Sequence, residues 1–372
     1  MRAQRRWPYL VGAALLLAAA GYFMSRGDAP EKPSPVETMH FPTRLRGDEY
    51  QRMEKRQTLL VKLAGEGPKQ PVQLHDPLMA ALPAGGPGKT AVVIEANALR
   101  NSPIGELLLD CMRTKHGGGD PLAPFRDKTH IDLLTDVDRV AVTDDGTIVT
   151  GNFKNADWDQ IPLFKEASQS PYGDHAVMYT PSGASDRPFP PGVGAMAVWN
   201  GEMVITGATE AQVEASIDRL EGRAPPVQPA IDEGDSYGDV YGTLSPADLA
   251  KMLGTTGPSG AMAQKILDAA QQVKLHIDAQ GDVDMVADVE GPDADKVTDL
   301  GKALGGALSL GRIEAQAKGD GDLADLLDLA RIQPDGDKFE AKLALPMSML
   351  QKKLAWCRAA LDGGSAQPPP AP

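Results

Sequence analysis

One run of residues near the start constrains this chain more than any other feature. Between Arg6 and Ser25, residues 7–24 form a stretch of eighteen amino acids without a charged side chain, WPYLVGAALLLAAAGYFM. As a helix, such a stretch rises about 27 Å, close to the roughly 30 Å hydrocarbon core of a bilayer. Aromatic side chains lie at both ends of the run, as in the aromatic belts of membrane-spanning helices. The run therefore predicts a single transmembrane helix within residues 1–27.

The charge distribution predicts the orientation of this helix. Residues 1–27 contain four arginines and no acid, whereas the whole chain has 37 basic and 51 acidic residues and a net charge of −14. The N-terminal segment thus carries +4 and the remainder −18. Because positive residues stay on the cytoplasmic side, we expect the N-terminus inside and the body of the protein outside. The composition, rich in Ala, Gly and Asp, indicates a bacterial source, so the body is expected in the periplasm.

A cleaved signal peptide is the alternative interpretation of the same residues. The basic start, the apolar core over residues 10–17 and the small residues 18–20 fit such a peptide. Residues 21–24 (GYFM) continue the apolar run beyond the would-be cleavage site, which favours an uncleaved anchor in the inner membrane. Both interpretations export the chain, which in the second case is secreted or free in the periplasm.

The composition excludes several classes of protein. Hydrophobic residues make up 42% of the chain, too many for a disordered protein. An acidic chain without a basic stripe does not fit binding to nucleic-acid phosphates. Two cysteines and six scattered histidines supply neither a disulfide framework nor a zinc site of common spacing. We expect no cofactor and no metal.

Segments rich in glycine and proline divide the rest of the chain. Residues 65–88 hold ten of these residue types in 24 positions, which is typical of a linker. The expected parts are a tether, stalk helix and linker over 28–88, a first α+β module over 89–222, a linker over 223–234, a second α+β module over 235–362 and a disordered tail over 363–372.

Hydrophobic periodicity and turn chemistry predict the elements of the two modules. In the first, we expect strands over 91–96 and 175–180, hairpins over 139–151 and 195–206, and helices over 103–113 and 156–167 and after Thr209. In the second, we expect strands over 238–244, 312–317 and 339–345, a hairpin over 274–290, and helices after Ser245 and over 261–273, 292–308, 323–330 and 347–361. This order is that of a split βαβ unit and predicts two ferredoxin-like modules.

Short motifs that could carry chemistry lack their necessary context. Gly88-Lys89-Thr90 ends like a phosphate-binding loop, but Pro83 stands where the first glycine belongs, and a strand follows instead of a helix. The glycine-rich segment 116–119 has the composition of an esterase oxyanion loop, but the chain contains no G-x-S-x-G nucleophile motif. Two Arg-Gly-Asp tripeptides, at 26–28 and 46–48, are short enough to occur by chance.

The acids and histidines are expected to be structural. The abundant aspartates, such as Asp284 and Asp288 on one face of a strand, form no complete calcium loop, so we interpret them as solvated. In Gly319-Asp320-Gly321-Asp322 we expect a loop in which Asp322 caps the next helix. His276 lies inside a predicted strand and is interpreted as a surface or hydrogen-bonded sheet histidine.

The two cysteines are the candidate site residues. Cys111 lies in the predicted helix over 103–113 and Cys357 in the last predicted helix. In an oxidising compartment they could form a disulfide that ties the first module to the end of the second. Two separately buried thiols are the alternative.

These observations favour a non-enzymatic, membrane-tethered envelope protein that binds or scaffolds another envelope protein in the periplasm. The absence of a recognisable catalytic motif and the presence of a tether support this interpretation. A small-molecule or lipid-binding exported protein is the alternative. A hydrolase with a site that residue spacing does not reveal is the third possibility.

Overall fold

The computed structural model describes residues 41–42, 76–115, 120, 122–182, 189–190, 192–225, 227–253, 257–335 and 338–353. The predicted membrane helix, stalk helix and tail, the segment 116–119 and both Arg-Gly-Asp tripeptides lie outside these residues. Among the helices that are described, none is long and apolar enough to cross a membrane.

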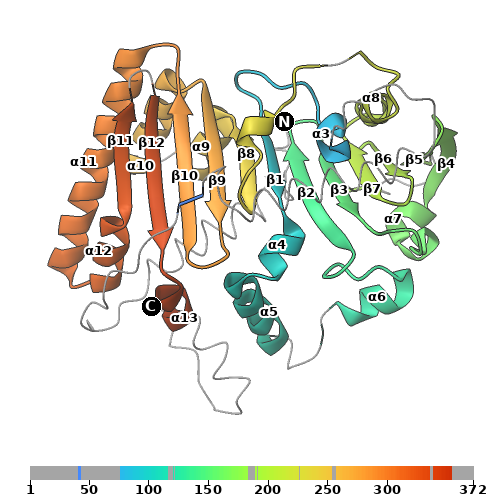
Figure 1. The fold of residues 1–372 in the computed structure, drawn as a ribbon, viewed down its shortest axis with the longest axis horizontal. Helices are drawn as coiled ribbons and strands as arrows, with labels where there is room; N and C mark the ends of the chain where they lie inside the picture. The colour runs from blue at the N-terminus through green and yellow to red at the C-terminus, as the bar shows by residue number, and fades with distance from the viewer. Residues whose placement is uncertain are drawn as a thin grey trace. The chain divides into compact units, whose positions relative to one another are not determined.

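The strands form a twelve-stranded sheet in the order β11-β12-β10-β9-β8-β1-β2-β3-β7-β6-β5-β4 (Figure 1). The strands are β1 Ala91–Ile94, β2 Val137–Thr143, β3 Thr147–Gly151, β4 Ala167–Tyr172, β5 Ala176–Pro181, β6 Ala195–Trp199, β7 Met203–Gly207, β8 Val240–Leu244, β9 Gln272–Asp278, β10 Val283–Glu290, β11 Ala330–Asp335 and β12 Lys338–Leu345. The described residues divide into two compact units: unit 1 contains residues 76–96 and 125–245, and unit 2 contains residues 41–42, 97–124 and 246–353.

The prediction of two ferredoxin-like modules is wrong. Every described strand register is antiparallel, and seven of these ten pairings join strands that are consecutive in the chain, six of them with no helix in between. The sheet of a split βαβ unit is also antiparallel, but another strand lies between the two strands that its crossover helix joins, so the observed order of chain-consecutive neighbours overturns the prediction. Short connections explain this order: between β6 and β7 only residues 200–202 intervene, and Asn200 (φ 52°) and Gly201 (φ 64°) supply the left-handed backbone of this hairpin turn.

Two element predictions contribute to this error. The helix expected over 156–167 is only the short turns η1 (Trp158–Gln160) and α7 (Pro162–Lys165), followed by the unpredicted strand β4. The strand expected over 312–317 is instead the second half of the 25-residue helix α11 (Ala294–Lys318). Its alternating letters RIEAQA read as a strand, but no proline interrupts the helix, and Glu314 and Lys318 form an i,i+4 ion pair of 2.7 Å.

In unit 1 both faces of the sheet carry apolar side chains. One face packs against α3 (Pro77–Ala81) and α8 (Glu210–Leu220), with Val93, Ile148 and Ile205 fully buried in between. Thr209 caps α8, which confirms the predicted helix start, and it also forms a capping box with Gln212. The opposite face packs against η1, α7 and the helix α6 (Ala123–Thr129). Strands buried on both faces need apolar residues at consecutive positions, as in AMAVW of β6.

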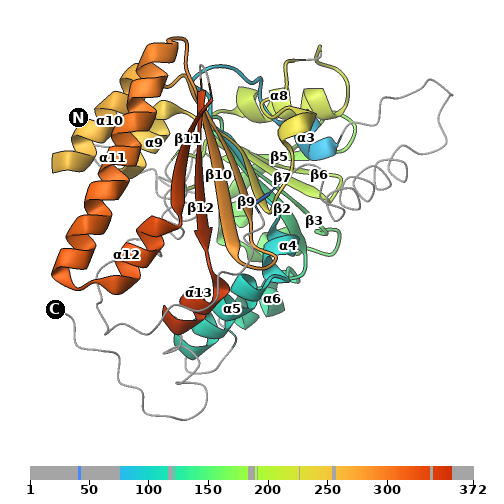
Figure 2. The same cartoon turned by 60° about the vertical axis from the view of Figure 1, so that its left-hand side comes forward.

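In unit 2 the apolar face of the sheet packs against helices. The helices of this unit are α4 Ala96–Arg100, α5 Pro103–Lys115, α9 Pro246–Leu253, α10 Gly257–Ala269, α11, α12 Gly321–Asp328 and α13 Met347–Lys353. Helix α11 runs along β11 and β12 (Figure 2). Gly301 of α11 faces the ring of Phe339 on β12, where an added Cβ would lie 3.3 Å from that ring. The small residue therefore permits the close approach of helix and sheet.

The two edge strands share one feature. Strand β4 ends the sheet in unit 1 and β11 ends it in unit 2. Each has a proline as its penultimate residue, Pro171 in β4 and Pro334 in β11. Proline lacks an N–H group, so each edge loses one donor with which a further strand could pair.

Candidate functional site

The polar residues of the described chain gather in three places, two in unit 1 and one in unit 2. No group of three or more His, Cys, Asp or Glu side chains that could hold a metal ion occurs among these described residues. The hydrogen bonds and burial of each cluster therefore indicate whether it has polar groups left for a ligand or partner.

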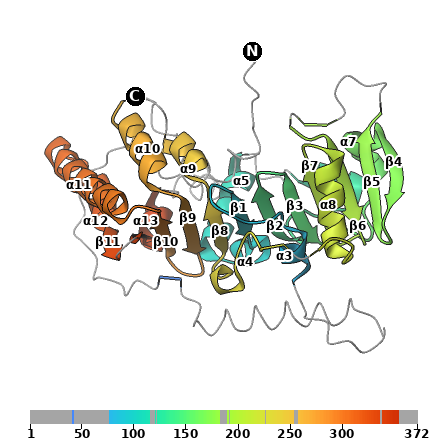
Figure 3. The same cartoon turned by 90° about the horizontal axis from the view of Figure 1, so that it is seen from above.

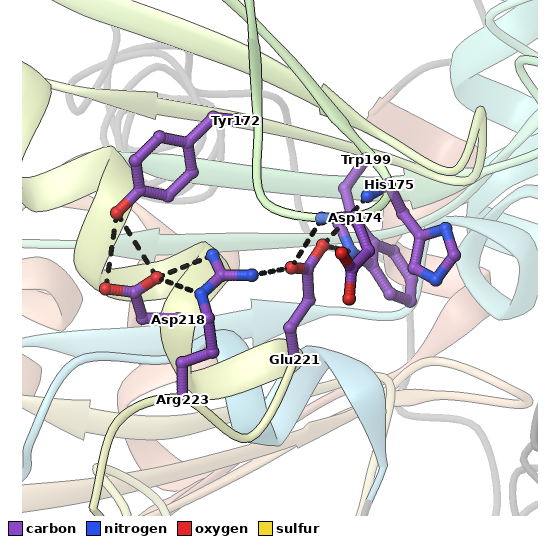
Figure 4. Close-up of polar contacts among 7 residues, drawn as sticks. All are labelled: Tyr172, Asp174, His175, Trp199, Asp218, Glu221 and Arg223. Atoms are coloured by element: carbon purple, nitrogen blue, oxygen red, sulfur yellow. Dashed lines mark hydrogen bonds and ion pairs between the residues drawn. The ribbon is translucent and has the colours of Figure 1, made fainter.

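The first cluster, here called the α8 clamp, is centred on Glu221, the residue after α8 (Figure 4). Its carboxylate accepts hydrogen bonds from the backbone N–H groups of Asp174 (2.9 Å) and His175 (3.1 Å) in the β4–β5 turn. It also accepts one from Trp199 Nε1 on β6 (3.1 Å) and forms an ion pair with Arg223. With its side chain only 4% exposed, Glu221 ties the end of α8 to two strands.

Arg223 extends the α8 clamp to a second carboxylate. It donates to Asp218 through Nε (2.9 Å) and one terminal nitrogen (2.6 Å), and its guanidinium lies 5.3 Å from the ring centroid of Tyr172. Partial burial and the charge of Asp218 raise the pKa of the Tyr172 hydroxyl, which donates to Asp218 at 3.2 Å. A carboxylate has about four acceptor positions, and those of Glu221 are occupied. The α8 clamp therefore holds the turn in place and offers no unused acceptor at its centre.

The second cluster is a buried charged network around Arg139 of β2. Arg139 forms a bidentate ion pair with Asp76, the N-cap of α3, in which both side chains are less than 15% exposed. Burial alone would lower the pKa of Arg139, but the attraction of Asp76 and Glu95 outweighs it and raises that pKa. The hydroxyl of Tyr241 donates to Glu95 at 3.0 Å. The sequence signal that was missed is the arginine inside the apolar strand pattern VDRVAVT.

The register places both clusters of unit 1 in one cross-strand row. From Arg139 the row passes through opposed pairs to Tyr172 at the edge. The positions in order are Arg139, Thr150, Met203, Trp199, Ala176 and Tyr172. Polar bonding is thus concentrated at one end of an otherwise apolar sheet face, where α3 and α8 are fixed to it.

The third feature, here called the polar face, is the side of the unit 2 sheet opposite α11. Its charged members occupy alternate positions of four strands: Lys274, His276 and Asp278 on β9, Asp284, Asp288 and Glu290 on β10, Lys338, Glu340 and Lys342 on β12, and Arg331 and Asp335 on β11. Four basic and six acidic residues thus share this face, with His276 counted as neutral. Ion pairs join Lys274 to Glu290 (3.5 Å) and Lys342 to Glu340 (2.5 Å). A surface of mixed charge fits neither an anionic lipid layer nor a phosphate backbone.

The interior part of the polar face departs from the expected solvated pattern. Asp278 and Asp284 lie opposite each other in the register, and each is only 3% exposed. His276 is 1% exposed and has an interaction partner, so it is a buried sheet histidine, and the alternative of a surface position is wrong. The prediction of a solvated face is wrong for Asp284, because alternation fixes the side of a strand but not what covers that side.

Helix α11 carries the most exposed large apolar side chains of the described chain. Leu310 is 69% exposed and Ile313 is 57% exposed, whereas solvent-facing helix positions are usually polar. They continue a line of small or apolar residues at alternating spacings of three and four: Ala303, Gly306, Leu310, Ile313 and Ala317. This line, here called the α11 seam, has the a/d spacing of a helix that packs along another helix.

The aspartates singled out in the sequence have local structural roles. Asp144 accepts from the N–H of Thr90 (2.9 Å), and Asp145 accepts from the side chain of Gln212 (2.9 Å). The cap of α12 is Asp320, whose carboxylate accepts from the N–H of Leu323 at 3.1 Å, so the assignment of Asp322 is wrong. Helix α12 begins at Gly321, two residues earlier than the predicted start at residue 323.

Of the predicted cysteine pair, the structure describes one member. Cys111 is half-buried in α5 and is not a free thiol. Cys357 lies outside the described residues, so the bond between the two stays a prediction. Helix α13, which precedes Cys357, packs against α5, and both helices belong to unit 2. Such a bond would therefore close unit 2, whereas the sequence predicted a link between two modules.

Comparison with protein-family models, curated proteins and solved structures finds no match for this chain. The geometry of the described residues therefore carries the functional argument. The two clusters of unit 1 are internally bonded, which leaves the α11 seam and the polar face of unit 2 as surfaces for interaction.

Proposed function

We propose that this chain is a non-enzymatic protein of the bacterial cell envelope. In this proposal residues 1–27 anchor it in the inner membrane with the N-terminus in the cytoplasm. The body lies in the periplasm and binds another envelope protein. The uncharged run of residues 7–24 and its flanking arginines support the anchor.

The α11 seam is the observation that supports protein binding. Two large aliphatic side chains, more than half exposed and one helical turn apart, lose apolar contact with water when a partner covers them. The a/d spacing indicates that the partner contributes an α-helix, whose side chains would fit between Leu310 and Ile313. The small residues Ala303 and Gly306 at the start of the seam would permit close approach of that helix.

Capture by variants of the full-length chain tests this proposal. The detergent-solubilised wild type should retain one stoichiometric envelope protein, and the variant Leu310→Glu/Ile313→Glu should lose it by at least tenfold. Gln316→Glu, an exposed substitution on the same helix outside the seam, is the matched control and should retain the partner. The retained protein is then purified and its affinity for each variant is measured.

Two outcomes contradict this proposal. Equal retention by wild type and seam variant would show that the seam does not bind the partner. A seam-dependent dimer in light scattering, without a second protein, would replace the heterologous partner by another copy of this chain.

A further inference from the structure

A residue from a distant part of the sequence, Phe41, contacts the polar face of unit 2. The ammonium of Lys342 on β12 lies 5.6 Å from the ring centroid of Phe41. This distance is within the roughly 6 Å over which a cation is attracted to an aromatic ring. Pro42, the next residue, is buried, and Phe41 is partly buried.

The arrangement of unit 2 places this contact on the side of the sheet opposite α10 and α11. In Figure 3 the short blue segment 41–42 lies across the sheet from α10 and α11. The clustering of the chain likewise assigns residues 41–42 to unit 2, although unit 2 otherwise begins at residue 97. Phe41 and Pro42 are therefore part of unit 2, while the intervening residues 76–96 belong to unit 1.

We propose that the polar face is a docking surface for the chain's own Phe41–Pro42 segment. The residue types fit this role. Phe41 supplies apolar area and a π-face for Lys342, whose position is fixed by its ion pair with Glu340. Pro42 has no N–H group, so its burial on a sheet face leaves no backbone donor without a partner.

Docking would set the distance between unit 2 and the membrane, a consequence that rests on the proposed anchor. From Arg26 to Phe41 the chain has 15 peptide steps, which span at most about 50 Å when fully extended. If the first attachment to the body were Asp76, 50 steps would allow up to about 170 Å. The docked segment thus shortens the tether about threefold and keeps unit 2, with the α11 seam, near the bilayer.

Site-specific photo-crosslinking tests the docking itself, without reference to a membrane. In the detergent-solubilised full chain, p-benzoylphenylalanine replaces Phe41, and crosslinked peptides are mapped by mass spectrometry. The expected peptides contain residues 338–342 of β12. The variant Lys342→Met keeps the length of the side chain but removes its charge, and should lower the yield about two- to fivefold. Lys352→Met, at an exposed lysine of α13, should leave the yield unchanged. Crosslinks to unit 1, or equal yields in the two lysine variants, would overturn the proposal.

Energy transfer in vesicles tests the shortened tether. A fluorophore on α11 of the full chain and an acceptor on lipid headgroups should show lower transfer in Phe41→Ala than in wild type. Phe189→Ala, a substitution in unit 1, serves as the control and should match wild type. If the chain does not insert into vesicles, the proposed anchor fails, whereas crosslinking still decides the docking. If it inserts and Phe41→Ala leaves transfer unchanged, the inference about the tether is wrong.

Discussion

The parts of the sheet in unit 1 and unit 2 differ in the character of their second face. In unit 1 both faces are apolar and covered by helices, and the charged groups are confined to one bonded row. In unit 2 one face is apolar, and the other carries charged residues of both signs. An antiparallel sheet needs only one apolar face for stability, so the second face of unit 2 can carry charged residues. Part of that face is itself covered, since His276, Asp278 and Asp284 are at most 3% exposed. We therefore propose a structural role for unit 1 and a contact role for the more exposed part of the polar face in unit 2.

The largest expected effect comes from placing a charged residue on the apolar second face of unit 1, compared with placing an apolar residue on the polar face of unit 2. Val198→Asp places a carboxylate on the buried second face of unit 1, where Val198 is 7% exposed. We expect a loss of about 5 kcal/mol or more in the free energy of unfolding, because a buried charge without a partner is strongly unfavourable. Lys274→Val on the polar face should change it by less than about 1 kcal/mol. Urea unfolding measures the free energy of unfolding of both variants. Similar losses in Val198→Asp and Lys274→Val would contradict the distinction between the units.

The next effect concerns the buried network of unit 1. Arg139→Met leaves the carboxylates of Asp76 and Glu95 without their cation, which should cost about 3–5 kcal/mol. The matched change in unit 2 is Arg312→Met, which removes an exposed ion pair with Asp328 and should cost less than about 1 kcal/mol. Because the body has two units, unfolding is followed by hydrogen exchange of each unit separately. A loss confined to unit 2 in Arg139→Met would be inconsistent with the network described.

A smaller effect is expected from neutralising the α8 clamp. Glu221→Gln keeps the shape of the side chain but weakens its charge-assisted hydrogen bonds, which should cost about 1.5–3 kcal/mol. Faster hydrogen exchange should appear at Asp174 and His175, whose N–H groups donate to Glu221. Glu210→Gln, in the exposed first turn of the same helix, is the control. It should leave the N–H groups of the β4–β5 turn protected from exchange. Equal exchange in both variants would mean that the clamp is dispensable.

The smallest effect is a pH dependence of unit 2. Burial and the negative charge of Glu340 raise the pKa of Asp288 above its usual range. The folded state thus holds this proton to a higher pH than the unfolded chain does, and the stabilisation is present at low pH and lost as pH rises through the raised pKa. Asp288→Asn should therefore raise Tm at pH 7, and the gain should shrink as the pH falls below the usual aspartate range. Asp299→Asn, at an exposed aspartate of α11, should show no such trend.

The hairpins and most helices could be predicted from the sequence because their signals are local. Asn200-Gly201 and the helix cap at Thr209 act within a few residues, and the structure confirms both. Strand β4 (ASQSPY) was missed because an edge strand that faces solvent lacks the apolar alternation on which strand prediction depends. The sequence placed the helix over 103–113 in the first module, whereas α5 belongs to unit 2. Contacts between residues 97–124 and residues 246–353 join positions distant in the chain, so no local sequence pattern indicates them.

The polar face and the Arg139 network were also beyond prediction from local sequence patterns. Alternation indicated that Asp284 and Asp288 share one side of a strand, but the ladder of β9, β10, β12 and β11 was needed to assemble the polar face. The Arg139 network joins residues 63 positions apart in the ion pair with Asp76 and 146 apart in the bond from Tyr241 to Glu95. No spacing rule connects such positions, because only the fold brings them together.

The prolines near the ends of the two edge strands have a consequence for crowding. Proteins anchored in one bilayer are confined to two dimensions and share an orientation, so the edges of neighbouring copies would meet far more often than in solution. Pro171 and Pro334 each remove a donor from the edge that such a neighbour would extend. If the proposed anchor holds the chain in a membrane, these prolines would oppose lateral extension of the sheet by a neighbouring copy and so work against the joining of copies into fibres.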